Sequence, residues 1–129
     1  MQRKTVVILG ASADRSKFGN KSVRAHVAQG WEVYPVNPRG GEIEGLHVYK
    51  SICDVPRPIT RVSSYLPPAV GVAVLDDVAA AQPGEFFVNP GAESDELIEK
   101  ARSLGLDPIL ACSIVDLGVS PAAFGPDPR

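Results

Sequence analysis

Residues 5–20, TVVILGASADRSKFGN, run from an apolar stretch through a loop of small residues toward a helix. Residues 5–9 are apolar or β-branched throughout, which is typical of a central parallel strand buried on both faces. Val23 and Val27 lie four residues apart and Gly30 follows, a pattern that predicts a helix closed by a glycine. A strand, a glycine turn and a helix N-terminus present unpaired backbone N–H groups that suit a phosphate. We therefore expect a phosphate-bearing nucleotide here; the alternative is a tight turn that binds nothing.

The glycine spacing differs from two common nucleotide-binding motifs. A G-x-G-x-x-G motif from Gly10 would need glycines at positions that hold Ser12 and Arg15, and the G-x-x-x-x-G-K-[ST] loop of P-loop NTPases is absent. The acid that grips the ribose in NAD-binding proteins is also missing after the second expected strand, where Asn37 and Arg39 stand. Arg39 is placed to meet a phosphate on the ribose, as in NADP or in the 3′-phosphate of coenzyme A.

Length and composition predict one domain over residues 1–129, with residues 119–129 as an extended tail. No apolar run reaches the roughly 18 residues of a membrane span, and the apolar stretch before Gly10 is too short for a secretory signal. Cys53 and Cys112 lack the spacing of a zinc site or a disulfide framework, so we expect no metal and a cytoplasmic location.

Positive charge gathers in the first third of the chain. Residues 1–41 hold seven Lys and Arg against two acids, whereas the remaining residues hold six against thirteen. The overall net charge of −2 disfavours a nucleic-acid surface, while the basic first third suits a small anionic ligand. Neither a membrane nor a particular protein partner is indicated, and the oligomeric state stays open.

Strand and helix patterns alternate along the whole chain. Strands are expected at residues 5–9, 31–36, 61–66, 85–88 and 108–111, with a small strand or turn at 44–49. Helices are expected after residue 17, from Pro67-Pro68 with Val70, Val74, Leu75 and Val78 on one apolar face, and from Ser113 to about Leu117. A further helix is expected before Gly105, with Leu97, Ala101 and Leu104 facing inward. This alternation predicts a Rossmann-like, three-layer α/β/α fold with a mainly parallel sheet of about five strands.

Four expected strand ends carry glycine, proline or asparagine. They are residues 10–12, 36–39, 65–68 and 89–92. Because ligands bind beyond the carboxyl ends of parallel strands, we expect these four segments to meet at one edge of the sheet and to form the site.

Six motifs in order carry a resemblance to a known family: GAS at 10–12, KFG at 17–19, YPVNP at 34–38, YLPP at 65–68, NPGAES at 89–94 and ACSI at 111–114. With them the chain resembles the stand-alone CoA-binding domain proteins. These are similar to the N-terminal domain of the succinyl-CoA synthetase α subunit and of ADP-forming acyl-CoA synthetases. The resemblance covers about Lys4 to Leu117 and implies coenzyme A or an acyl-CoA as the ligand.

The resemblance also implies a role for each matching segment. Gly10, Ala11 and Ser12 would hold the diphosphate through backbone N–H groups, and Lys17, Phe18, Gly19 and Asn20 would shape the rest of that loop. Val36, Asn37, Pro38 and Arg39 would pack the adenosine and its 3′-phosphate. Tyr65, Leu66 and Pro67 would flank the pantetheine, and Asn89, Pro90 and Gly91 match a turn of the family.

The sequence contains no recognisable set of catalytic residues. In the multidomain synthetases, the phosphorylated histidine and the nucleotide-grasping part lie outside the domain that this chain resembles. We expect His26 and His47 to be structural or exposed and Cys112 to be a buried, inert thiol, with a thiol that meets the CoA sulfur as the alternative. The acids at 93, 95 and 96 fit a helix start, which leaves the phosphates at the first helix.

The sequence therefore predicts a non-catalytic module, carrier or sensor for CoA or an acyl-CoA. Two alternatives remain open. One is a small NADP-dependent oxidoreductase or another nucleotide-binding protein, and the other is a domain that has kept the fold and lost the ligand.

Overall fold

A sheet of five parallel strands forms the centre of the computed structural model, which describes residues 3–125. In spatial order the strands are β2 (Glu32–Val36), β1 (Thr5–Leu9), β5 (Arg61–Ser64), β6 (Glu85–Val88) and β7 (Pro108–Ile109). An antiparallel hairpin of β3 (Glu42–Ile43) and β4 (Leu46–His47) occupies the segment expected as a small strand or turn. The predicted Rossmann-like α/β fold is confirmed.

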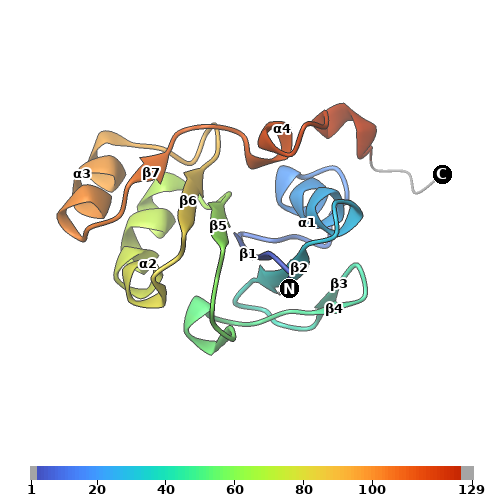
Figure 1. The fold of residues 1–129 in the computed structure, drawn as a ribbon, viewed down its shortest axis with the longest axis horizontal. Coiled ribbons are helices and arrows are strands. Elements are labelled where there is room, and N and C mark those ends of the chain that lie inside the picture. The colour runs from blue at the N-terminus through green and yellow to red at the C-terminus, as the bar shows by residue number, and fades with distance from the viewer. Residues whose placement is uncertain (1–2, 126–129) are drawn as a thin grey trace.

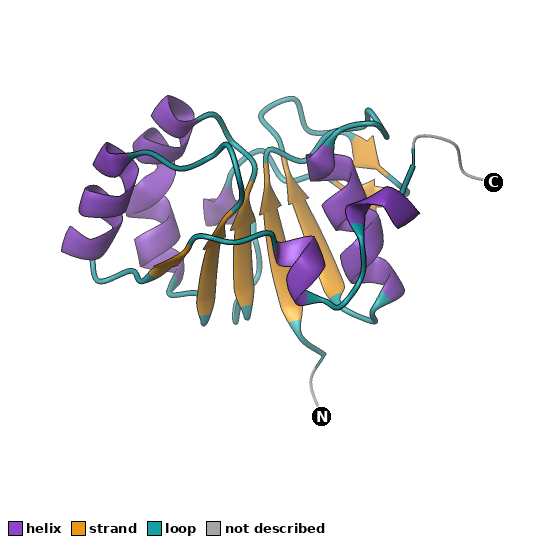
Figure 2. Cartoon of the chain, turned by 90° about the horizontal axis from the view of Figure 1, so that it is seen from above, coloured by secondary structure: helices purple, strands orange, loops and turns teal. Residues whose placement is uncertain are grey.

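Helices cover both faces of the sheet (Figures 1 and 2). Helices α1 (Phe18–Ala28) and α4 (Ser113–Asp116) pack together on one face, and α2 (Pro68–Ala81) and α3 (Asp95–Ser103) pack on the other. Two 3-10 turns, η1 (Ile52–Asp54) and η2 (Pro121–Ala123), complete the described chain. None of the helices in residues 3–125 is both long enough and apolar enough to span a bilayer.

Strand β1 contributes side chains to two separate cores. Val6 and Ile8 face α1, where Val23 packs against them, whereas Val7 and Leu9 face the side of α2 and α3. All four side chains are at most 3% exposed. The unbroken apolar run therefore marks a central strand with two buried faces, as predicted.

Two predicted helix faces are wrong in part. Val27 is 48% exposed, because the buried face of α1 carries polar side chains beside Val23. Val70 is 47% exposed, and the buried face of α2 begins instead at Gly71. A Cβ at Gly71 would lie 2.9 Å from Leu97 Cδ1, so the glycine lets α2 approach α3 closely.

The chain also differs from expectation at the ends of two strands and in the tail. Strands β5 and β7 end at Ser64 and Ile109, two residues earlier than predicted. The segment up to residue 125 is not simply extended, because it contains η2 and because Arg24 donates to the carbonyls of Phe124 and Gly125 at 3.1 and 2.9 Å. Residues 126–129 of the predicted tail lie outside the described residues.

A buried arginine joins helix α1 to the sheet at the edge opposite to the predicted site. Arg61 donates to Glu85 at 3.0 Å and to Asp116 at 2.6 Å. Its Nη1 lies 3.4 Å from Nε2 of buried His26, whose Nδ1 lies 2.8 Å from the Ser22 carbonyl. The carbonyl requires an Nδ1–H donor, so Nε2 accepts from Arg61 and the ring is neutral. Burial lowers the pKa of His26 to about 4.

The buried histidine predicts a specific loss of stability in mild acid. In the unfolded chain His26 takes up a proton near pH 6.5, whereas in the folded chain it stays neutral down to about pH 4. The unfolded state therefore binds more protons in this window, and stability falls as the pH falls. We expect a loss of about 2 kcal/mol between pH 7 and 5, measured by urea unfolding. His26→Gln should remove most of this slope; an unchanged slope in that variant would contradict the assignment.

Candidate functional site

A cavity of about 1060 Å³ lies at the carboxyl ends of the strands. After β1, the chain places β2 on one side of β1 and β5 on the other, so the strand order reverses beside β1. The loops that leave β1 and β5 separate at this point, which is where open α/β sheets bind ligands. The four predicted strand-end segments all contribute to the cavity wall.

Most of the predicted site residues line this cavity. They are Gly10, Ala11, Ser12, Lys17, Phe18, Gly19, Asn37, Arg39, Tyr65, Leu66, Pro67, Asn89, Pro90 and Gly91. Three predicted residues do not line it. Asn20 is fully buried at the start of α1, Val36 is buried within β2, and Pro38 is exposed.

Sequence reasoning missed several lining residues. They are Ala13, Asp14, Gly40, Glu42 and Ile43. Pro68 and Ala92 lie in the predicted strand-end segments but were given no role of their own, and Cys112 was noted but not predicted to bind. Some adjoin a predicted motif and could have been included on that ground. Glu42 and Ile43 carry no such signal, because only the folding of the β3–β4 hairpin brings them to the cavity.

Two glycines determine how β1 passes into α1. Gly10 has φ +80°, a left-handed conformation that favours glycine, and a Cβ there would lie 3.2 Å from the Tyr65 carbonyl carbon. A Cβ on Gly19 would lie 2.3 Å from the Gly10 carbonyl oxygen, so α1 begins directly against the end of β1. The N-terminus of α1 has no side-chain cap and no acid in its first turn. This end of the helix is therefore suited to an anion.

The cations that follow β1 and β2 divide into two groups. Lys17 and Arg39 line the cavity. Arg15 does not, since its Nε lies 3.5 Å from a carboxylate oxygen of Glu44 on the hairpin turn. The neighbouring Glu44 therefore offsets the positive charge of Arg15. Asp14 also lines the cavity.

The carboxylate of Asp14 is held within its own turn. It accepts hydrogen bonds from the Ser16 hydroxyl at 2.6 Å and from the Ser16 N–H at 3.0 Å. These bonds lower the pKa of Asp14, which keeps it ionised. The acids predicted for the start of α3 stay away from the cavity, and Glu93 instead accepts the Gly91 N–H at 3.1 Å.

A buried polar network forms the wall at the β5–β6 side. Asn89 donates to the Ser63 hydroxyl at 2.8 Å and accepts the Ser113 N–H at 2.8 Å. The Ser113 hydroxyl lies 3.1 Å from the Tyr65 hydroxyl, and burial raises the pKa of Tyr65, which therefore remains a neutral phenol. The side-chain amide of Asn89 is engaged by protein, so it shapes this wall.

The cavity lacks the groups of a familiar catalytic site. Of the described residues, neither His26 nor His47 lines it, and no cluster that could hold a metal ion occurs between residues 3 and 125. Cys112 is a free thiol that lines the cavity and is partly exposed, so the expectation of a buried cysteine is wrong. The peptide after Cys112 enters the Asn89 network rather than a nucleophile–base pair.

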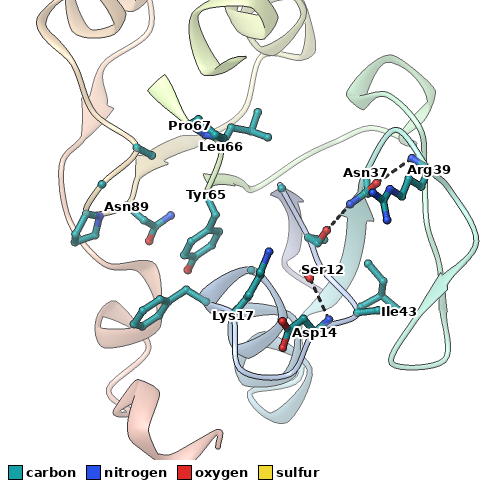
Figure 3. A pocket seen from close by; sticks show the side chains of 18 of the residues that line it. Ser12, Asp14, Lys17, Asn37, Arg39, Ile43, Tyr65, Leu66, Pro67 and Asn89 are labelled. Carbon is teal, nitrogen blue, oxygen red and sulfur yellow. Dashed lines mark hydrogen bonds between the residues drawn. The ribbon is translucent and has the colours of Figure 1, made fainter. Parts of the chain in front are cut away.

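The site is elongated and differs in character from end to end (Figure 3). Asn37 and Arg39 lie at one end, Ser12 and Lys17 lie in the middle, and Tyr65 and Asn89 lie toward the other end. On this side the lining includes the apolar residues Leu66 and Pro67, which follow Tyr65 in the chain, and Pro90 and Ala92, which follow Asn89. The arrangement offers two separate cationic positions and one apolar end to a long ligand.

Known proteins share both the sequence and the fold of this chain. The α subunit of ADP-forming acetate–CoA ligase I from Pyrococcus furiosus is 29% identical over 95% of this chain, which spans 31% of that subunit. A conserved hypothetical protein from P. furiosus is 32% identical, with a TM-score of 0.80 over 89% of this chain and 99% of its own. Dinucleotide-forming acetyl-coenzyme A synthetase 1 from Ca. Korarchaeum cryptofilum, in complex with phosphate and ADP, is 29% identical, with a TM-score of 0.72 over 82% of this chain and 25% of its own.

This chain spans less than a third of the curated relatives that it matches. A family model described as the CoA binding domain matches residues 4–118, which include every residue of the cavity wall. The resemblance noted from the motifs is thereby confirmed, and this chain belongs to the CoA-binding domain family.

Proposed function

We propose that the chain binds coenzyme A or an acyl-CoA in this cavity and acts as a non-catalytic binding module, carrier or sensor. The observation that carries the proposal is the cavity itself, with the uncapped N-terminus of α1 and Lys17 near its middle and Arg39 at one end. Coenzyme A has anionic groups at two places, the diphosphate and the 3′-phosphate. The two cationic positions and the apolar end match this distribution.

The residues suggest where each part of the ligand would lie. The diphosphate would lie at the turn of Gly10–Ser12, beside Lys17 and the uncapped N-terminus of α1. The adenosine and its 3′-phosphate would lie toward Arg39. The pantetheine would extend along Tyr65–Pro67 and Pro90, so that an acyl group would reach the apolar lining.

Other functions receive less support from the site. Arg39 would also suit the ribose phosphate of NADP, but the family favours coenzyme A. Among the residues that the structure describes, Cys112 is the one thiol of the cavity wall, and no histidine lines the cavity beside it. The α-subunit relatives carry far more chain than this domain, and a ligase activity would need groups that the cavity lacks. Two free cysteines accord with a reducing, cytoplasmic setting.

Calorimetry should show that CoA binds and NAD does not. Arg39→Ala should weaken CoA by about 1.5 kcal/mol, the lower part of the range for hydrogen bonds to charged groups, because Arg39 is exposed to solvent. Dephospho-CoA should bind the wild type more weakly than CoA and should be almost unaffected by Arg39→Ala. The matched control is Arg57→Ala, an exposed arginine outside the cavity, which should leave both affinities unchanged.

Two results would count against this placement. Heat with NAD but none with CoA would contradict the proposed ligand. Equal losses for CoA and dephospho-CoA in Arg39→Ala would mean that Arg39 contacts a group other than the 3′-phosphate.

The purified chain should also lack acyl-CoA synthetase activity. The expected reason is that buried His26 is bonded to Ser22 and Arg61 and lies outside the cavity wall, so it is unavailable as a phosphoryl acceptor. The test incubates the protein with radiolabelled nucleoside triphosphate, magnesium, CoA and a panel of small carboxylic acids. Acid-labile label on the protein, or acyl-CoA formed at a rate lost in His26→Asn, would refute the binding-module proposal.

A further inference from the structure

Asn37 uses both ends of its side-chain amide on backbone groups of two loops. Its Nδ2 donates to the Ala11 carbonyl at 2.8 Å, and its Oδ1 accepts the Arg39 N–H at 2.9 Å (Figure 3). Both loops line the cavity, the first as the glycine turn and the second as the segment that carries Arg39. The amide of Asn37 is thus engaged by the protein and holds these two loops in a fixed relation.

Asn20, in helix α1, donates a hydrogen bond to the next carbonyl of the same turn. Its Nδ2 donates to the Ser12 carbonyl at 2.9 Å and to Glu44 at 3.1 Å, and its Oδ1 accepts from Arg24 Nε at 2.7 Å. Asn20 is fully buried in the first turn of α1. Its orientation is therefore determined by three bonds, and one of them is to the turn.

Each captured carbonyl fixes the N–H that follows it. A trans peptide is planar, so the C=O of one residue and the N–H of the next point to opposite sides. The bond from Asn37 to Ala11 therefore orients the Ser12 N–H, and the bond from Asn20 to Ser12 orients the Ala13 N–H. Both N–H groups point away from the asparagine that holds their peptide, and both residues line the cavity.

The two N–H groups are also free to bind. Within residues 3–125, neither the Ser12 nor the Ala13 N–H donates a hydrogen bond to protein. The neighbouring N–H groups are engaged, since that of Ala11 donates to the Val36 carbonyl and that of Asp14 donates to the Ser12 hydroxyl. A pair of consecutive free N–H groups in a cavity is a typical anion-binding arrangement.

We propose that Asn37 and Asn20 are positioning residues that turn the Ser12 and Ala13 N–H groups toward the diphosphate of the ligand, without touching the ligand themselves. The inference rests on the proposed function and assigns the diphosphate to two particular peptides. Asn37 has a second effect, because it also holds the Arg39 N–H. It thereby fixes the position of the loop that carries Arg39 relative to the glycine turn.

The test follows the backbone amide signals of Ser12 and Ala13 in a ¹H–¹⁵N NMR titration with CoA and, separately, with inorganic pyrophosphate. In the wild type both amide protons should shift downfield as the anion binds. Asn37→Ala should reduce the Ser12 shift and spare that of Ala13, whereas Asn20→Ala should do the reverse. Each variant should weaken CoA about tenfold, the effect of one misdirected charge-assisted hydrogen bond.

Two comparisons separate positioning from a general loss of structure. With Asn20→Ala, the loss should appear with adenosine 3′-phosphate 5′-diphosphate and be absent with adenosine 3′-phosphate, which has no diphosphate. With Asn37→Ala, the loss should be larger for the first nucleotide than for the second, because Asn37 also holds the Arg39 N–H. The control Ser103→Ala removes another side-chain bond to a backbone carbonyl, the 2.7 Å bond to Lys100 on α3, and should change neither amide shift. If Asn20→Ala fails to fold, the amide shifts in Asn37→Ala still test the inference, because Asn37 is only half-buried and its substitution disturbs the core less.

The outcomes distinguish this inference from the proposed function. If the wild type binds pyrophosphate at Ser12 and Ala13 but does not bind CoA, the proposed function fails. The pyrophosphate titrations of the two asparagine variants then still test whether the asparagines position these N–H groups. Equal losses with both nucleotides, variants with unchanged shifts and affinity, or a wild type whose two amides respond to neither anion would each overturn the inference.

Discussion

The contact between Gly19 and the carbonyl of Gly10 is the constraint on which the site depends. Any side chain at position 19 would overlap this oxygen, so only glycine lets α1 begin directly against the end of β1. Strand β1 cannot shift to relieve the contact, because it is buried on both faces and paired with a strand on each side. The short turn between the two elements therefore has little freedom, and its N–H groups are presented from a rigid base.

Helix α1 is held by hydrogen bonds as much as by apolar packing. Its buried face carries Asn20, which bonds to the glycine turn at one edge of the sheet, and His26, which bonds to Arg61 near the other edge. Buried polar groups are costly unless they are paired, so these bonds favour one rotation of the helix over others with similar apolar contact. The same helix thus connects the cavity with the buried arginine.

The short helix α4 is held in a comparable way. A four-residue helix has too few internal hydrogen bonds to be stable alone. Ser113 at its start bonds to Asn89 in the cavity wall, and Asp116 at its end bonds to Arg61. These two attachments place Cys112 at the cavity although it comes from the far end of the chain.

Local patterns in the sequence were sufficient to predict the architecture and the edge of the sheet at which the cavity lies. The apolar run of residues 5–9 predicts a strand buried on both sides, and the alternation of strands and helices predicts a parallel sheet. Parallel strands bring their carboxyl ends together, so the residues after four strands could be expected to meet. Gly10 and Arg39 could therefore be assigned to one site before any contact was known.

Only the tertiary structure decided which polar groups remain available to a ligand. The sequence placed Asn20, Asn37 and Asn89 among the candidate site residues, but the folded chain engages each of their side chains with protein groups. Arg15 and Lys17 are equivalent in sequence, yet Glu44 pairs with one and the other lines the cavity. Val27 and Val70 match an apolar spacing but face solvent, because polar contacts orient α1 and a glycine contact orients α2. The spacing of apolar residues predicts which face of a single helix or strand is buried. The orientation of these side chains depends instead on contacts with residues that are distant in the chain.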